Sequence, residues 1–119
     1  MTNKKMTRQQ VAEIALAARA KGEQPSLAYA NLTGLDMTGL DMTGANLTGA
    51  DMSHTNIDYA NLRDAKLCHA DLTGANLTGT NLTAADLTGA TLTAADLEGA
   101  ALHGAILTDA DLYRANLGG

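Results

Sequence analysis

A five-residue repeat constrains this chain more than any other feature of its sequence. From Pro25 to Gly119 the sequence divides into nineteen consecutive five-residue units without an insertion. The third place of a unit is always large and apolar, with Leu in fifteen units, Met in three and Ile in one. The first place is Ala in fourteen units, the second is Asn or Asp in fourteen, the fourth is Thr or Ser in eleven, and the fifth is Gly in ten.

A period of five matches neither regular secondary structure. A helix returns side chains to one face every 3.6 residues and a strand every 2.0 residues, so neither keeps all the third places on one side. A backbone that turns a corner every five residues does keep all the third places on one side. The first and third places then point inward, and the other three point outward. Gly tolerates a positive φ, and Asn and Asp side chains bond nearby backbone, which suits them to corners. Short units in a fixed period predict a solenoid, in which each coil leans on its neighbours.

The unit A(N/D)LxG resembles that of the pentapeptide repeat family, and the match extends over residues 25–119. The resemblance implies an all-β solenoid, a right-handed quadrilateral β-helix with four units per coil. Nineteen units then make about 4.75 coils, which at ~4.8 Å per coil give a rod of ~23 Å. Residues twenty apart should stack into internal ladders, such as Leu27, Leu47, Leu67, Leu87 and Leu107, or Met37, Ile57, Leu77, Leu97 and Leu117.

Residues 1–24 form a separate N-terminal segment of different composition. Met1–Met6 is polar and is expected to be frayed, and a helix is predicted over about residues 8–20. Thr7 and Gln10 have the spacing of a capping box, and Gly22 is a suitable stop. The helix is expected to cap the first coil, since solenoid ends expose core and unpaired strand edges. The alternative, an amphipathic helix for a membrane or a partner, has only a small apolar face to support it.

Charge separates the two segments. Residues 1–24 carry a net charge of +3 and residues 25–119 carry −8, which together give the −5 of the chain. Seven of the ten Asp residues in the rod occupy the second place, where they alternate with Asn, and this favours a local role at the corner over a role in recognition. The single cysteine, the absence of an apolar run of about 20 residues and a polar N-terminus lead us to expect a cytoplasmic protein without internal disulfides.

Two regions of the rod depart from the repeat on its outer surface. The first, a candidate interaction belt, comprises His54, Asp58, Tyr59, Arg63, Asp64, Lys66, Cys68 and His69. The alternative is that this coil has drifted freely on a tolerant surface. The second is a candidate dimer end, because no capping helix follows the last unit and an open coil invites another copy. It comprises Leu102, Leu107, Leu112, Tyr113, Arg114 and Leu117.

The sequence predicts no enzyme, no cofactor and no metal site. Stacking at a spacing of twenty residues places no two of His54, His69, His103 and Cys68 together, whereas zinc needs about four converging ligands. Phosphate-binding glycine motifs are absent, and a convex rod is expected to lack a cleft that excludes water. We therefore expect a scaffold that binds a protein partner, with a possible homodimer through its C-terminal end and no direct contact with membranes or nucleic acid.

A rod of this kind could also have one of two other functions, as a mimic of duplex DNA or as an ice-binding protein. Some members of the resembled family mimic duplex DNA and bind DNA gyrase. The rod would show one net charge per about 3 Å, a lower density than the ~1.7 Å of a DNA duplex. Ice binding through Thr ladders is the other alternative, but most of the Thr columns are interrupted, for example by Asp58 and Glu98 in the column that contains Thr38 and Thr78. Thr also suits any extended surface position.

Overall fold

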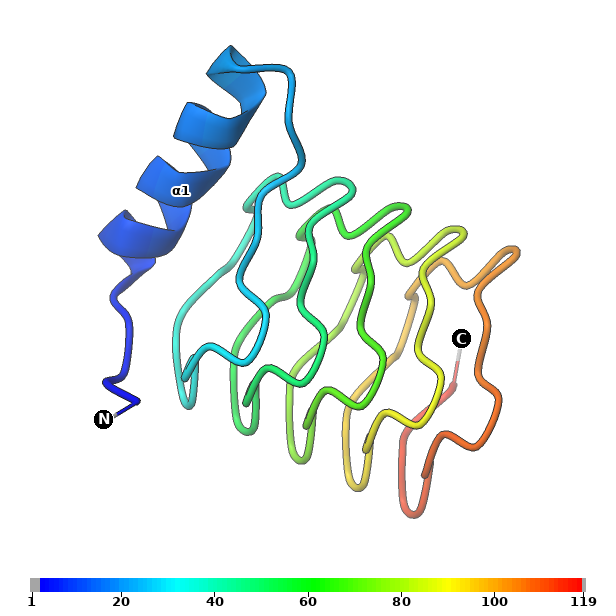
Figure 1. Cartoon of the computed structure of the whole chain (residues 1–119). Coiled ribbons are helices and arrows are strands. Elements are labelled where there is room, and N and C mark those ends of the chain that lie inside the picture. Colours follow the sequence, from blue (N-terminus) through cyan, green and yellow to red (C-terminus); the bar gives the residue numbers. More distant parts are fainter. Residues whose placement is uncertain (1–2, 119) are drawn as a thin grey trace.

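The computed structural model describes residues 3–118 and shows one helix followed by a four-sided coil (Figure 1). Helix α1 spans Arg8–Ala20 and lies at one end of the coil. The sides of the coil are paired by single parallel bridges rather than by long strands, and each bridge within the coil joins second places twenty residues apart, as in Asn56↔Asn76. This spacing confirms four units per coil. The first coil is residues 25–44, the second 45–64, the third 65–84 and the fourth 85–104, and residues 105–118 begin a fifth.

Each place of a unit has its own hydrogen-bond partner. The first-place N–H closes a turn within the chain, the second-place N–H donates to the preceding coil, and the third- and fifth-place N–H groups donate to the following coil. The fourth-place N–H donates to the side chain of the second-place Asn or Asp, which explains that residue preference. In unit 75–79 the five acceptors are the carbonyls of Leu72, Thr55, Asp96 and Glu98 and the Oδ1 atom of Asn76.

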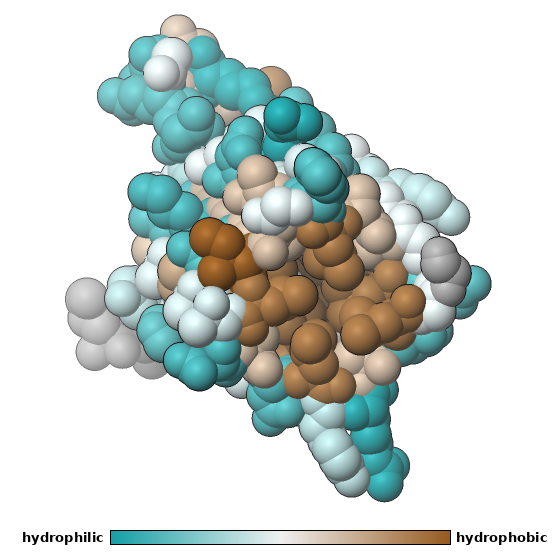
Figure 2. All heavy atoms as spheres, turned by 90° about the vertical axis from the view of Figure 1, so that its right-hand side faces the viewer, coloured by the Kyte–Doolittle hydropathy of each residue, from teal (hydrophilic) through white to brown (hydrophobic). Residues whose placement is uncertain are grey.

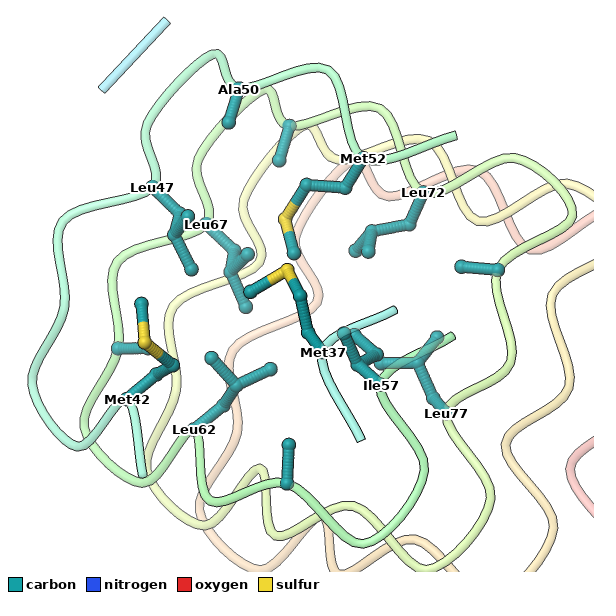
Figure 3. Packing of buried hydrophobic residues seen from close by; sticks show 14 of the residues in the cluster. Met37, Met42, Leu47, Ala50, Met52, Ile57, Leu62, Leu67, Leu72 and Leu77 are labelled. Carbon is teal, nitrogen blue, oxygen red and sulfur yellow. The ribbon is translucent and has the colours of Figure 1, made fainter. Parts of the chain in front are cut away.

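The core is a narrow column of aliphatic side chains. Third-place residues from Leu32 to Leu92 are essentially fully buried, and the first-place Ala residues between them are buried too. Side chains from successive coils stack along the column, so that Leu47 lies next to Leu67 and Leu72 next to Met52 (Figure 3). Two first places hold Thr instead of Ala. The buried hydroxyl groups of Thr55 and Thr80 donate to the carbonyls of Met52 and Ile57, each over 2.7 Å, so neither is left unpaired.

The fifth place turns the corner in the left-handed backbone region. Its φ is positive both for Gly79 (65°) and for non-glycine residues such as Tyr59 (59°) and His54 (59°). A fifth-place side chain leans toward the next coil and lies against the corner there. A Cβ added to Gly79 would lie 2.5 Å from the Tyr59 ring, and one added to Gly74 would lie 2.6 Å from Nδ1 of His54. At these corners a large residue is thus followed by glycine twenty positions later.

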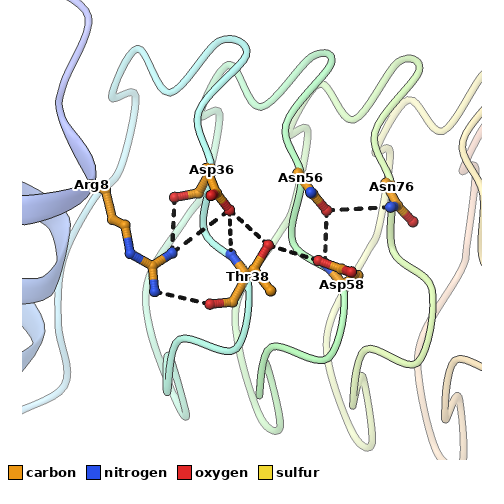
Figure 4. A network of polar contacts seen from close by, with 6 residues as sticks. All are labelled: Arg8, Asp36, Thr38, Asn56, Asp58 and Asn76. Atoms are coloured by element: carbon orange, nitrogen blue, oxygen red, sulfur yellow. Dashed lines mark hydrogen bonds and ion pairs between the residues drawn. The ribbon is translucent and has the colours of Figure 1, made fainter.

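Helix α1 covers the open end of the first coil. The predicted capping box is present, since Gln10 N–H donates to Thr7 Oγ1 and Thr7 N–H donates to Gln10 Oε1. Val11 and Ala15 are buried against the coil. Arg8 donates to the carbonyls of Asp36 and Thr38, both over 3.0 Å (Figure 4). The apolar face of α1 is therefore used to cover the first coil, and not to bind a membrane or a partner.

The prediction that residues up to Met6 are frayed is wrong for the part that the structure describes. Lys5 forms a parallel bridge with Asn31, and the Met6 N–H donates to the Asn31 carbonyl over 2.9 Å. The Asn3 side chain donates to the carbonyl of Tyr29 over 3.0 Å. The first coil has no coil before it, so its edge carries free backbone groups, and residues 3–6 pair with them. Residues 1–2 lie outside the described residues.

Candidate functional site

The candidate belt encircles the rod instead of forming a site. His54, Tyr59, Asp64 and His69 are fifth-place residues in successive units, so each lies on a different corner of the four-sided coil. All four are exposed. One ion pair joins belt residues in the described part of the chain, between Nε of Arg63 and Oδ2 of Asp64 at 3.6 Å. The belt can therefore be touched from four directions, but its side chains do not converge on one ligand.

The remaining belt residues take part in local bonding along the sides. Asp58 accepts a 2.8 Å hydrogen bond from the Thr38 hydroxyl, within a polar row that runs from Arg8 along one side of the rod (Figure 4). Lys66 is an exposed second-place residue whose backbone bridges to Asn46 and Asp86. Cys68 is half-buried, with its Sγ 4.0 Å from the Asp86 carbonyl.

Cys68 has the opposite of the electrostatic setting that activates a nucleophile. Burial raises the pKa of the Cys68 thiol, and the neighbouring Asp86 raises it further. The thiolate is the reactive form of cysteine, so this environment keeps the group protonated and inert. Among residues 3–118 no three His, Cys, Asp or Glu side chains lie close enough together to hold a metal ion.

A small hollow lies between α1 and the first coil, where the sequence led us to expect a convex surface without clefts. Its volume is about 230 Å³. Its walls are aliphatic except for Arg19 and Asp41, whose Nη2 and Oδ1 atoms form a 3.2 Å ion pair. Because this acid and base neutralise each other, the hollow contains no free group for acid–base chemistry. It is lined by Ala12, Ala15, Leu16, Arg19, Leu40, Asp41 and Met42.

Apolar side chains are exposed at the C-terminal end of the rod. Figure 2 views this end and shows an apolar patch surrounded by hydrophilic side chains. Leu117 is 55% exposed, and Leu102, Leu107 and Leu112 are half-buried, whereas their counterparts one coil earlier are buried. Tyr113 and Arg114 are exposed nearby, with the guanidinium 5.3 Å from the centre of the ring. The structure thus places the six residues of the candidate dimer end together at this end of the rod.

Ile106 is a further exposed apolar residue of the final turns of the coil, and reasoning from the third places alone missed it. It is a second-place residue, 47% exposed, at a position where Asn or Asp is the rule. An apolar residue in an outward place is the signal that identifies it. We define the C-terminal apolar end as Leu102, Ile106, Leu107, Leu112 and Leu117.

Backbone groups are also left over at this end. In earlier coils the third- and fifth-place N–H groups donate to the following coil, and the first-place carbonyl accepts from it. Within the described residues the N–H groups of Leu112 and Arg114 and the carbonyl of Ala110 have no such partners. Within the described residues, this edge therefore combines partly exposed leucines with backbone donors and acceptors that have no partner.

The fold and the repeating corners define a solenoid of right-handed, four-sided coils. A family model for pentapeptide repeats matches eight copies, over residues 26–58, 60–99 and 85–119. The chain belongs to the pentapeptide repeat family. No curated protein matches it.

Solved structures of the same family resemble the chain. Rfr23, a pentapeptide repeat protein from the cyanobacterium Cyanothece 51142, is 31% identical with a TM-score of 0.76, over 77% of this chain and 63% of that one. A pentapeptide repeat protein from Nostoc PCC 7120 is 31% identical with a TM-score of 0.52, over 88% of this chain and 78% of that one. A trypsin-treated form of QnrB1, a plasmid-mediated fluoroquinolone resistance protein, has a TM-score of 0.66 at 23% identity, over 80% of this chain and 49% of that one. The last likeness shows the fold alone. The chain spans less than two thirds of the length of Rfr23.

Proposed function

We propose that this chain is a non-enzymatic interaction module that docks another protein on its C-terminal apolar end. The observation that supports this proposal is the combination of exposed leucines and unpaired backbone groups at that end of the rod. An edge of this kind binds an incoming strand by main-chain hydrogen bonds and side-chain burial together. The belt at His54–His69 is the second candidate surface, and it differs in being polar and spread around the rod.

A scaffold function also agrees with the chemistry of the outer surface. Most second-place Asp and Asn side chains accept hydrogen bonds from the fourth-place residue, and several of these aspartates lie against a Thr or Ser hydroxyl. The one cysteine is held as a protonated thiol. A general base or nucleophile works in a site that excludes water, whereas His54, Asp64 and His69 lie exposed on separate corners.

The experiment that tests this proposal is affinity capture from an extract of the native cell with three baits. The first is the wild-type chain, and the second carries Ile106→Asp, which restores the usual second-place residue while removing an exposed apolar side chain from the end. The third is a belt variant, with His54, Tyr59 and His69 changed to Gly and Arg63 to Thr. We expect a partner that the wild-type and belt baits retain and that the Ile106→Asp bait loses.

The capture experiment also has clear contrary results. Loss of the partner with the belt bait alone would transfer the docking role to the belt. Retention of no protein above background by any bait would refute the proposal of an interaction module.

A duplex mimic that binds DNA gyrase is the second candidate, and its support is weaker. The likeness to QnrB1 favours it at the level of fold. The acidic charge is diluted, because Asp36, Asp41 and Asp64 already pair with arginines. Inhibition of supercoiling by purified gyrase at micromolar protein would establish this function, and unchanged supercoiling would eliminate it.

A further inference from the structure

The hollow between α1 and the first coil has the size and the lining of a site for a small ligand. We infer that it binds a neutral molecule whose apolar body is about as large as one six-membered ring with a short substituent, and whose single polar head lies at the mouth of the hollow. This inference goes beyond the proposed function, because the hollow and the C-terminal apolar end lie at opposite ends of the rod.

The hollow exists because small residues of the helix face large residues of the coil. Ala12 and Ala15 lie one helical turn apart and contribute only methyl groups to its wall. On the coil side the wall is formed by Met42, a third-place residue, and by Leu40, which replaces the usual Ala at a first place. The alanine methyl groups are too short to fill the space between the helix and the coil.

The volume of the hollow limits the ligand to a small molecule. An apolar cavity of about 150 Å³ is large enough to bind benzene, and this hollow has a volume of about 230 Å³. The difference leaves room for a short substituent beside one ring. Larger ligands need the ~300–1,000 Å³ of a typical ligand pocket.

Leu16 supplies apolar surface that a ligand would cover. Its side chain lines the hollow and is 67% exposed, whereas Met42 on the coil side is buried. An apolar body in the hollow would remove part of the Leu16 side chain and the alanine methyl groups from water. Removal of apolar surface from water is the main favourable contribution to binding in such a site.

The charges at the mouth select a neutral ligand. The side chains of Arg19 and Asp41 are partly exposed, and Nη2 of Arg19 lies 3.2 Å from Oδ1 of Asp41. The Thr43 hydroxyl donates to the same Oδ1 atom over 2.6 Å and thereby favours the ionised carboxylate. A carboxylate on the ligand would be repelled by Asp41, and an ammonium group would be repelled by Arg19. A hydroxyl or carbonyl head can bond to either side chain without repulsion.

Three probes with the same ring test the inference: benzyl alcohol, benzoate and benzylammonium. Each is titrated into the full chain, and binding is followed by the NMR signals of the methyl groups of Ala12, Leu40 and Met42. Benzyl alcohol should shift these signals with a dissociation constant of about 1 mM, which is reasonable for a probe of this size. Each charged probe should bind roughly fivefold or more weakly, because its charge must leave water beside a charge of the same sign.

A variant that fills the hollow tests the apolar body of the site. Ala12→Leu places a larger side chain in the hollow and should weaken the binding of benzyl alcohol about tenfold or more. Ala17→Leu is the matched control, because Ala17 is an exposed residue of α1 that does not line the hollow. This control should bind benzyl alcohol as the wild type does.

Asp41→Asn tests the mouth by removing one of its two charges. Asn closes the same turn at Asn61, whose Oδ1 accepts from the Arg63 N–H over 3.0 Å, so the variant is expected to fold. Arg19 also donates to the backbone carbonyl of residue 41, a bond that the variant keeps. Because the guanidinium is then no longer neutralised, benzoate should bind roughly fivefold or more tightly than it binds to the wild type.

Four results would overturn the inference: no shift with benzyl alcohol up to about 20 mM, equal binding of the three probes to the wild type, unchanged binding to Ala12→Leu, or unchanged benzoate binding to Asp41→Asn. Equally large shifts at the methyl groups of Leu112 would show adsorption to any apolar surface and would overturn it too. Circular dichroism should be the same for all the variants. The selectivity among the probes is measured on the wild-type chain, so it tests the inference whether or not a variant folds.

Discussion

At the scale of single residues, the backbone conformation at the corners explains a pairing rule: a large fifth-place side chain is followed by glycine twenty residues later. Tyr29, His54, Tyr59 and His69 each lean over a glycine twenty residues later, at Gly49, Gly74, Gly79 and Gly89. The positive φ at the corner fixes the direction of the leaning side chain, and the glycine leaves room for it. These four glycines are therefore required by particular side chains as well as by their own backbone.

We expect Gly79→Ala to destabilise the fold more than Gly99→Ala. Both impose a side chain on a left-handed backbone, with φ of 65° and 71°, at a cost of roughly 1–2 kcal/mol. Only the Cβ at position 79 meets a ring, and displacing Tyr59 from its rotamer adds about 0.5–1.5 kcal/mol. Urea denaturation measures both variants, and a Tyr59→Gly background should remove the difference. Equal destabilisation in the wild-type background would contradict the pairing rule.

At the scale of one unit of the repeat, some second-place aspartates have their pKa lowered by the hydroxyl group two residues later. The Thr43 hydroxyl lowers the pKa of Asp41, the Ser53 hydroxyl lowers the pKa of Asp51, and the Thr88 hydroxyl lowers the pKa of Asp86. In each case the hydroxyl donates to the carboxylate, and the backbone N–H of the same residue donates as well.

These lowered pKa values predict acid sensitivity. A carboxyl whose pKa is lower in the folded chain stabilises the fold fully above its unfolded value of about 4. That contribution is lost as the pH falls from about 4 through the folded pKa. Changing Asp41, Asp51 and Asp86 to Asn should flatten this loss in thermal melts recorded between about pH 2 and pH 6. Asn already closes the same turn at Asn46 and Asn76, so the variant is expected to fold. If the variant lost stability in acid as steeply as the wild type does, these aspartates would not be the source of the acid sensitivity.

The cap formed by α1 is expected to protect the first coil in particular. Val11→Asp places a charge in a fully buried position and should release α1 from the coil. Contacts in a solenoid join neighbouring coils, so the loss should stay local. Hydrogen exchange measured by mass spectrometry should then accelerate in residues 26–44 and change little in residues 66–97.

Ala17→Asp is the matched control for the cap, because Ala17 lies on the same helix, is exposed and does not line the hollow against the first coil. It should leave the exchange of the first coil unaltered. Faster exchange throughout the rod in the Val11→Asp variant would show that the cap supports the whole fold and not only its neighbour.

At the scale of the whole molecule, the inner column decides whether the chain folds at all. Leu77 is fully buried in the third coil, with a coil on either side. Leu77→Asp should abolish the cooperative melting transition, since an unpaired charge in this column has no partner. The control is Leu117→Asp in the exposed final coil, which should melt like the wild type. A normal melting curve for Leu77→Asp would contradict the inward assignment of the third place.

Much of this architecture could be predicted from the sequence because the period is strict. The alternation of inward and outward places follows from the unbroken apolar third place, and the helix bounds follow from local signals at Thr7 and Gly22. The pairing of Lys5 with Asn31 could not be predicted in that way, because a bridge to a free edge depends on the finished coil and not on local composition. The spread of the belt over four corners likewise needed the coil geometry. The exposure of Ile106 was available from its exceptional residue type.

The hydrogen bonds within a unit show that the residues that determine the fold differ from those that form the binding surface. Backbone donors are satisfied by other backbone groups or by the second place, so the fourth-place side chain can vary with little consequence for the winding of the chain. The fifth-place side chain can vary only where the neighbouring corner leaves room for it. Sequence similarity between two members of the family therefore reflects mainly their shared core residues. Two members of the family can agree along their whole length and still bind different molecules, because a minority of outer positions distinguishes one binding surface from another.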